Sequence, residues 1–337
     1  MQDKINKIIW SIIPILILIF IFVFIYNNNR KKDYTRKFFY MDTYIYVKLY
    51  DINKKDADKY LDEKENIYKK YHKLTDRYNE YDNIKNIYYI KYNKSEEEYI
   101  KIDKELYDII SYGIDYYDKT NGLVDISMGN VIDVWKKYRD NKNGVPSIEE
   151  LEKANNNIKI ELKDGKIKNN HPNIDLGSIA KGYTTKVVGE YLKKQNINKF
   201  LINAGGNVLV GDKNKKDYLI GIEDPNSKDD IFDIVKGSNI AVVTSGGYER
   251  YYEYNGKKYH HIISPKTLYP TDNMKSVTVV TSDSALADIL STYLFLLNID
   301  DGLKYVNSLE NVEAIWYTND DKIIKSDGFD KYEYKTK

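Results

Sequence analysis

The sequence contains no cysteine and only four histidines among its 337 residues. The missing cysteine excludes disulfide bonds, thiolate metal sites, a cysteine nucleophile and a lipid anchor attached through a thioether. Four histidines are too few to favour a histidine-rich transition-metal centre. A metal used by this protein is therefore expected to be a hard cation bound by oxygen ligands.

Two common nucleotide-binding signatures are also missing. No Gly-x-Gly-x-x-Gly follows a strand pattern, and no phosphate-loop Gly-Lys-Ser/Thr occurs. Basic and acidic side chains number 52 and 51, which gives a net charge of +1 and predicts no general attraction to nucleic acid. The apolar fraction of 42% is ordinary for a globular protein, so the chain can bury a sizeable core.

The longest apolar run lies near the N-terminus, from Ile8 to Tyr26, and lysines and arginines flank it on both sides. As a helix it would span about 28 Å, close to the thickness of a bilayer core. A cleaved signal peptide has a shorter apolar core and small residues at its cleavage site. We therefore predict an uncleaved transmembrane anchor over residues 1–29, a basic linker at 30–37 and one folded domain at 38–337.

The spacing of apolar residues predicts both strands and helices in the folded part. Asn255-Gly256, between 251–254 and 257–261, is typical of a hairpin with a type I′ turn. This hairpin, together with strand–helix units, indicates an α+β fold with mixed or antiparallel sheets and packed helices in two intimately associated subdomains. We predict helices at 60–78, 102–121, 179–191 and 284–297, strands at 44–50, 200–202, 276–280, 312–317 and 323–324, and polar, turn-rich chain at 139–171.

The helix predicted at 284–297 carries the first candidate site. Asp288 and Thr292 are four residues apart and share one face, while their neighbours are mostly apolar and indicate burial. A buried carboxylate needs a partner or a cation, and these two side chains offer oxygen ligands to magnesium. Taken alone, local capping or pairing of Asp288 and a bond from Thr292 back to the helix explain the pattern as well.

A second candidate lies at 175–183, where Gly177 and Ser178 precede a predicted helix start. Free N–H groups at such a position attract phosphate. Lys181 falls in the first turn, where the helix dipole disfavours a cation, so we expect an anionic partner for it. An ordinary exposed lysine is the alternative.

His260 and His261 close the predicted hairpin. Adjacent strand residues face opposite sides, so only one of them can point into a site. A lone strand histidine is more often a surface or core residue than a catalytic one. A histidine within reach of a hydroxyl nevertheless suits general-base work.

Taken together, several segments resemble the ApbE flavin transferase family over about residue 38 to the end. Each motif is modest alone, but their order along the chain agrees, and the resemblance favours the functional interpretation of the candidates above. The matching segments are Met41-Asp-Thr43, Asp125-Ile-Ser-Met-Gly129 with Trp135, Asp175-Leu-Gly-Ser-Ile-Ala-Lys-Gly-Tyr183, Asn203-Ala-Gly-Gly-Asn207, Ser245-Gly-Gly-Tyr-Glu-Arg250, Tyr259-His-His-Ile-Ile-Ser-Pro265 and Ser282-Asp-Ser-Ala-Leu-Ala-Asp288 with Ser291-Thr292.

The resemblance implies that FAD is bound in a cleft between subdomains. Met41, Asp125, Lys181 and Ile263 match family positions that contact FAD. The stretch 83–84 aligns only loosely with a further flavin contact.

The resemblance also implies a magnesium site beside the FAD pyrophosphate. Asp288, Thr292 and a main-chain oxygen of Ser178 match its ligands, and His261 matches the histidine usually taken as the base. Three positions depart from the family pattern without removing a ligand or the base. They are Asp42 in place of Gly, Gly247 in place of a common Asp, and Ser264 in place of a frequent Asp before Pro.

The activity implied is magnesium-dependent transfer of FMN from FAD to a Thr or Ser hydroxyl of a target protein, with release of AMP. The alternatives are a pyrophosphatase that splits FAD into FMN and AMP, and a non-catalytic FAD-binding protein. The family's partners are often subunits of membrane redox complexes or extracytoplasmic flavoproteins. With the predicted anchor, this implies a single-pass protein of the cell membrane whose catalytic domain lies on the extracytoplasmic side.

Overall fold

The computed structural model describes residues 13–17, 19–20, 30–156, 158–214 and 216–335. Most of the predicted anchor, Ile8–Tyr26, lies outside these residues. Among the residues that are described, no helix is long and apolar enough to cross a membrane.

An eight-stranded sheet forms the centre of the molecule, in the order β1-β2-β6-β7-β10-β13-β14-β15. Every pair of neighbours in the described sheet is antiparallel. The predicted α+β class is thus confirmed, in its antiparallel form. The strands are β1 (Lys32–Tyr40), β2 (Thr43–Ile52), β6 (Phe200–Ala204), β7 (Asn207–Val210), β10 (Ala241–Gly246), β13 (Ser276–Thr281), β14 (Glu313–Tyr317) and β15 (Ile323–Lys325).

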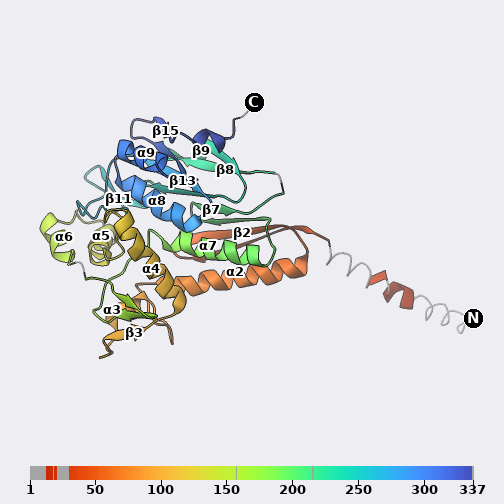
Figure 1. Cartoon of the computed structure of the whole chain (residues 1–337), viewed down its shortest axis with the longest axis horizontal. Helices are drawn as coiled ribbons and strands as arrows, with labels where there is room; N and C mark the ends of the chain where they lie inside the picture. Colours follow the sequence, from red (N-terminus) through yellow and green to blue (C-terminus); the bar gives the residue numbers. More distant parts are fainter. Residues whose placement is uncertain (1–12, 18, 21–29, 157, 215, 336–337) are drawn as a thin grey trace, which may run out of the picture.

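Helices cover one face of this sheet. They are α2 (Lys54–Thr75), α7 (Ala180–Lys194), α8 (Ser284–Leu296) and α9 (Ile299–Asn307). Figure 1 shows α2 and α7 side by side along the sheet, and α7 also packs against α8. In β2, alternate residues Ile45, Val47 and Leu49 are fully buried beneath these helices, as the period of two in a half-buried strand requires.

The opposite face is covered by the hairpin of β8 (Tyr218–Asp224) and β9 (Ser227–Gly237). Its residues Ile220, Ile222 and Val235 form a second core with Val242 and Ile315 of the sheet. The short 3-10 helix η1 (Phe329–Lys331) joins this core through Phe329.

The remaining elements form a smaller region beside the sheet (Figure 1). Its main apolar residues belong to the same core as the sheet and its helices, so the two regions are joined through shared packing. The elements are α3 (Ile87–Tyr92), β3 (Tyr99–Lys101), α4 (Lys104–Lys119), α5 (Gly129–Asn141), α6 (Ile148–Ala154), β4 (Leu162–Lys163), β5 (Lys166–Lys168), β11 (Tyr251–Tyr254) and β12 (Lys257–His260).

The structure corrects the predicted basic linker at 30–37, because most of it lies in β1, paired with β2. In this strand Tyr34, Arg36 and Phe38 face the helices and alternate with exposed residues. The many charged side chains made this alternation hard to recognise in the sequence. The first helix, predicted at 60–78, begins earlier and ends earlier, at Lys54 and Thr75. It ends at Thr75 because the Asp76 side chain accepts the N–H groups of the two residues after Arg77 and turns the chain.

Candidate functional site

A cleft of about 420 Å³ opens where the β1–β2 turn, α5, the start of α7 and the β11–β12 hairpin meet. Segments from both regions of the fold line it, and α8 contributes one wall. All eight residues predicted for the site lie in its lining: Met41, Asp125, Ser178, Lys181, His261, Ile263, Asp288 and Thr292.

Asp288 is 6% exposed and lies where α8 crosses α7. Its Oδ2 accepts the backbone N–H of Gly182 at 2.7 Å. The helices approach so closely that a Cβ at Gly182 would lie 2.4 Å from the Asp288 Cβ and 2.4 Å from the Ser284 carbonyl oxygen. Glycine at 182 is therefore a steric requirement for this carboxylate position.

The bond from Gly182 to Asp288 also determines the start of α7. In a regular helix the Gly182 N–H would bond to the Ser178 carbonyl, but here it is directed to α8, and the helix begins at Ala180. The Ser178 carbonyl consequently receives no hydrogen bond among the described residues. Such an oxygen, in the cleft lining, is available as a ligand.

These groups fit a hard cation. Burial raises the pKa of Asp288, because an isolated carboxylate is poorly solvated there, and a bound cation would offset that cost. The Thr292 hydroxyl, one turn along α8, lies 3.3 Å from the Asp288 carbonyl oxygen and keeps lone pairs for a metal. No group of three or more His, Asp or Glu side chains suited to a metal occurs in the part of the chain that is described. One carboxylate with neutral oxygens suits magnesium, which commonly takes its other ligands from water and substrate phosphate.

The two adjacent histidines have different surroundings. His260 donates from Nε2 to the Thr271 carbonyl at 2.6 Å, and its Nδ1 accepts the Ile262 N–H at 3.2 Å. Its ring packs edge-on against Phe295. Both ring nitrogens are engaged, so His260 holds the loop in place and offers no group for chemistry.

His261 has one nitrogen committed. Its Nδ1 lies 3.2 Å from the Arg250 carbonyl, an acceptor, so Nδ1 carries the proton and Nε2 is left as an acceptor. His261 is exposed to the solvent of the cleft, but nearby protein atoms still desolvate its ring. Burial, followed by the charges of Lys181 and Arg250, holds the pKa of His261 well below its ordinary value of 6.5.

Lys181 has the anionic neighbours expected for it. Its charge opposes the effect of burial on the carboxylates of Glu249 and Asp288, whose pKa values burial raises. Lys181 lies in the first turn of α7. There the Ala180 N–H is bonded to the Leu176 carbonyl and the Gly182 N–H to Asp288, whereas the Lys181 N–H has no hydrogen-bond partner among the described residues. This end of the cleft therefore combines the charge of Lys181 with its own unbonded N–H group, an arrangement that suits a phosphate.

Met41 lies in a tight turn at the tip of the β1–β2 hairpin. Met41 and Asp42 both have positive φ, 55° and 56°, which L-residues other than Asn and Asp seldom adopt. This conformation suits glycine, the residue that the resemblance implies at position 42, and aspartate also tolerates it. The Arg250 guanidinium donates to the Asp42 carbonyl at 2.9 Å and the Met41 N–H faces His72 Nδ1 at 3.4 Å, which hold the tip at the cleft.

Asp125 and Ile263 occupy the side of the cleft nearer the small region. The Asp125 Oδ1 accepts both the N–H and the hydroxyl of Ser127, so the carboxylate has a defined orientation. Ile263 is buried in a cluster with Met128 and Trp135. Sequence motifs from α5 and from the β11–β12 hairpin thus form one wall.

Sequence reasoning missed Arg77, which lies in the cleft lining and is almost fully buried. It makes ion pairs of 3.0 Å with both Asp133 and Asp175 and donates to the Gly129 carbonyl at 2.7 Å. No periodicity could have indicated it, because its partners come from distant segments. The loosely aligned stretch 83–84 is absent from the lining, which residues 75–79 supply instead.

The two other departures from the family pattern have local explanations. A Cβ at Gly247 would lie 2.8 Å from the His260 ring, so a larger side chain there would require that ring to move. Ser264 is buried and accepts the Lys266 N–H in a turn, while its carbonyl accepts the Leu268 N–H.

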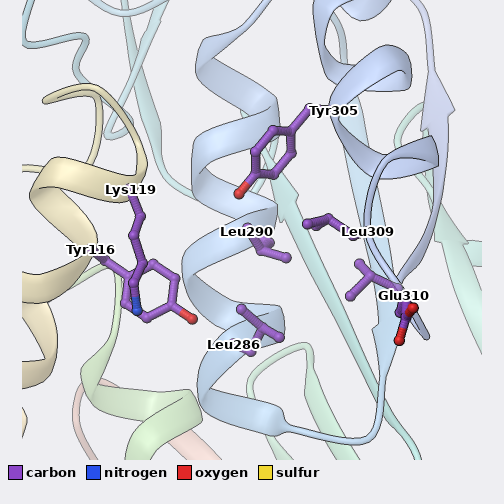
Figure 2. A pocket seen from close by; sticks show the side chains of 8 residues that line it. Tyr116, Lys119, Leu286, Leu290, Tyr305, Leu309 and Glu310 are labelled. Carbon is purple, nitrogen blue, oxygen red and sulfur yellow. The ribbon is translucent and has the colours of Figure 1, made fainter.

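A second cavity, of about 370 Å³, lies behind α8. Figure 2 shows Leu286 and Leu290 directed into it, whereas Asp288 and Thr292 line the main cleft. Its lining contains no histidine, and we assign no chemistry to it. The residues around it are Tyr116, Lys119, Leu286, Leu290, Tyr305, Leu309, Glu310 and Val312.

Comparison with known proteins places this cleft in a family. The sequence profile of the ApbE family matches residues 41–316. A FAD:protein FMN transferase of Klebsiella pneumoniae is 42% identical over 158 residues, which cover 45% of this chain and 48% of the relative. One from Buchnera aphidicola is 33% identical over 227 residues, covering 63% and 67% respectively. The chain thus spans about half the length of the first relative and about two thirds of the second.

Solved structures share the fold. The ApbE protein of Thermotoga maritima has a TM-score of 0.80 at 26% identity, over 90% of this chain and all of the other. The flavin transferase ApbE of Vibrio cholerae has a TM-score of 0.76 at 21% identity and supports the fold alone. It covers 90% of this chain and 99% of the other.

Proposed function

Since the chain belongs to the ApbE family, we propose that it is a FAD:protein FMN transferase that requires magnesium. It moves FMN from FAD to a Thr or Ser hydroxyl of a target protein and releases AMP. The observation that supports this most is that one cleft combines three oxygens suited to a hard cation with a histidine whose Nε2 is an open acceptor.

Asp288, Thr292 and the Ser178 carbonyl would hold the metal ion. A bound magnesium ion would supply positive charge that stabilises the pyrophosphate and the departing phosphate of AMP. The ammonium group of Lys181 and the unbonded main-chain N–H of the same residue bind phosphate oxygens on the same side. The protein thereby positions the diphosphate before any bond changes.

His261 acts on the acceptor. Its Nε2 takes the proton of the target hydroxyl as that oxygen forms a bond to the FMN phosphorus, and the bond from phosphorus to the AMP oxygen breaks. The bond from Nδ1 to the Arg250 carbonyl holds the ring in the tautomer that can accept. Because the lowered pKa keeps the imidazole neutral, it can act at ordinary pH.

Mass spectrometry tests the proposal. The detergent-purified full chain is incubated with FAD, MgCl₂ and a purified redox-complex subunit from the source cells, alongside the same subunit with its acceptor Thr changed to Val. We expect an FMN adduct on the unchanged subunit only, lost with EDTA. Free AMP without an adduct would instead indicate a pyrophosphatase, and neither product would indicate a flavin-binding protein.

We also propose that residues Ile8–Tyr26 anchor the protein in the cell membrane with the cleft on the extracytoplasmic side. The support is the length and apolarity of that run and the family's usual place of action. Protease added to intact cells without their wall should remove the folded domain. Protection until the cells are lysed would mean the opposite orientation and a cytoplasmic target.

A further inference from the structure

Asn207, the first residue of β7, is 1% exposed and lies behind the proposed metal site. Its Oδ1 accepts the hydroxyl of Ser284, the first residue of α8, at 2.8 Å. This bond fixes which side of the amide faces Ser284. The Nδ2 group, with its two hydrogens, is buried and finds no hydrogen-bond partner in the described chain.

The unpartnered Nδ2 lies next to Asp288. The position that a Cβ would take at Gly182 is 3.0 Å from Asn207 Nδ2 and 2.4 Å from Asp288 Cβ. Both groups therefore border the same point between α7 and α8.

We propose that Asn207 is the positioning residue for Asp288, and that its Nδ2–H orients the carboxylate for the metal ion. An unsatisfied buried donor destabilises the folded state, so its retention calls for a reason beyond stability. A small rotation of Asp288 on metal binding, with Gly182 still donating to Oδ2, gives Nδ2 its missing acceptor. This inference rests on the proposed metal site and adds to it a residue that does not line the cleft.

Partners that orient a metal-ligating side chain typically change metal affinity by about 10–100-fold when removed. Asn207→Leu keeps the approximate shape and removes the donor. In the metal-free protein we expect its unfolding temperature to change little, because the loss of the unpartnered Nδ2 group offsets the loss of the Oδ1 acceptor of Ser284. We expect the dissociation constant for Mn²⁺, a hard cation followed by its EPR signal, to rise at least 10-fold.

Asn207→Asp provides the opposite test. It keeps an oxygen for Ser284 and places a second carboxylate beside Asp288. The metal-free protein should be less stable, and the rise in unfolding temperature on adding MgCl₂ with FAD should be larger than in the wild type. If Asn207 served the fold alone, this substitution would change the unfolding temperature by the same amount with and without MgCl₂ and FAD.

Asn203→Leu is the matched control, since Asn203 belongs to the same Asn-Ala-Gly-Gly-Asn run, is half-buried and lies outside the cleft lining. Its Mn²⁺ affinity should equal that of the wild type. If Asn207→Leu does not fold, Asn207→Ser takes its place, because the shorter side chain cannot reach Asp288. Wild-type affinity in a folded Asn207 variant would overturn the positioning role alone, whereas a wild type that binds no Mn²⁺ would overturn the metal site as well.

Discussion

Gly182→Ala is the most direct test of the helix crossing on which the proposed metal site depends. The new Cβ would lie 2.4 Å from both the Asp288 Cβ and the Ser284 carbonyl, where ordinary contact begins at 3.4 Å. Since the Ser284 oxygen is main chain, no side-chain rotation relieves the overlap, and α7 and α8 must separate by about 1 Å.

Two effects of that separation can be estimated. Overpacking of this kind costs about 1–3 kcal/mol, less the roughly 0.5–1 kcal/mol that alanine gains over glycine within a helix. At about 2–4 °C per kcal/mol, the unfolding temperature should fall by several degrees. A shift of about 1 Å in a ligand that positions the substrate lowers turnover by about 100-fold, so the kinetic effect should exceed the thermal one.

Gly302→Ala is the control. Gly302 is also buried in a helix, α9, but its Cβ would meet only side-chain atoms at 3.4 to 3.6 Å, which is ordinary contact. We expect unchanged transfer and equal or slightly higher stability. Both variants are tested by thermal unfolding and by MgCl₂-dependent FMN transfer. A Gly182→Ala protein with wild-type stability and metal dependence would refute the reasoning.

Three further predictions concern the catalytic groups. Asp288→Ala should abolish metal-dependent transfer, whereas Thr292→Ala should reduce it less, because water can replace a neutral ligand. Titration of each variant with MgCl₂ measures the metal dependence of transfer. An unaltered metal dependence in Asp288→Ala would contradict the ligand assignment. His261→Ala should lower transfer by about 100-fold or more with little change in FAD affinity. His260→Ala should instead mainly lower the unfolding temperature, because the lost hydrogen bond and ring packing are structural, and an equal loss of transfer in this variant would reverse the two roles. Because the pKa of His261 is lowered, its neutral, proton-accepting form persists as pH falls, so protonation of this group should not reduce transfer between pH 7.5 and 5.5. An ordinary histidine would be about 90% protonated at pH 5.5. A pH–rate profile with a tenfold loss over this range would therefore contradict the assignment.

Local signals in the sequence determined several features by themselves. Asn255 and Gly256 both adopt positive φ in the β11–β12 turn, as an Asn-Gly pair between two strand patterns predicts. The Asp283 side chain caps α8 by accepting the N–H groups of Ala285 and Leu286, and the apolar run that follows is buried. The ordered motifs also identified residues that all prove to line one cleft. The turn and the helix cap are specified by a few neighbouring residues. The site residues are specified by the order of motifs along the chain, which can be compared with a family pattern.

Tertiary structure alone decided the rest. The polar β1 becomes a strand because β2 pairs with it, and Arg77 becomes part of the cleft because Asp133 and Asp175 come from other segments. The Ser178 carbonyl is an available ligand only because the Gly182 N–H is bonded to a helix about a hundred residues further along the chain. A sequence specifies which donors and acceptors exist, but which of them remain unpaired depends on contacts between distant segments, and those unpaired groups are the ones that can bind a ligand.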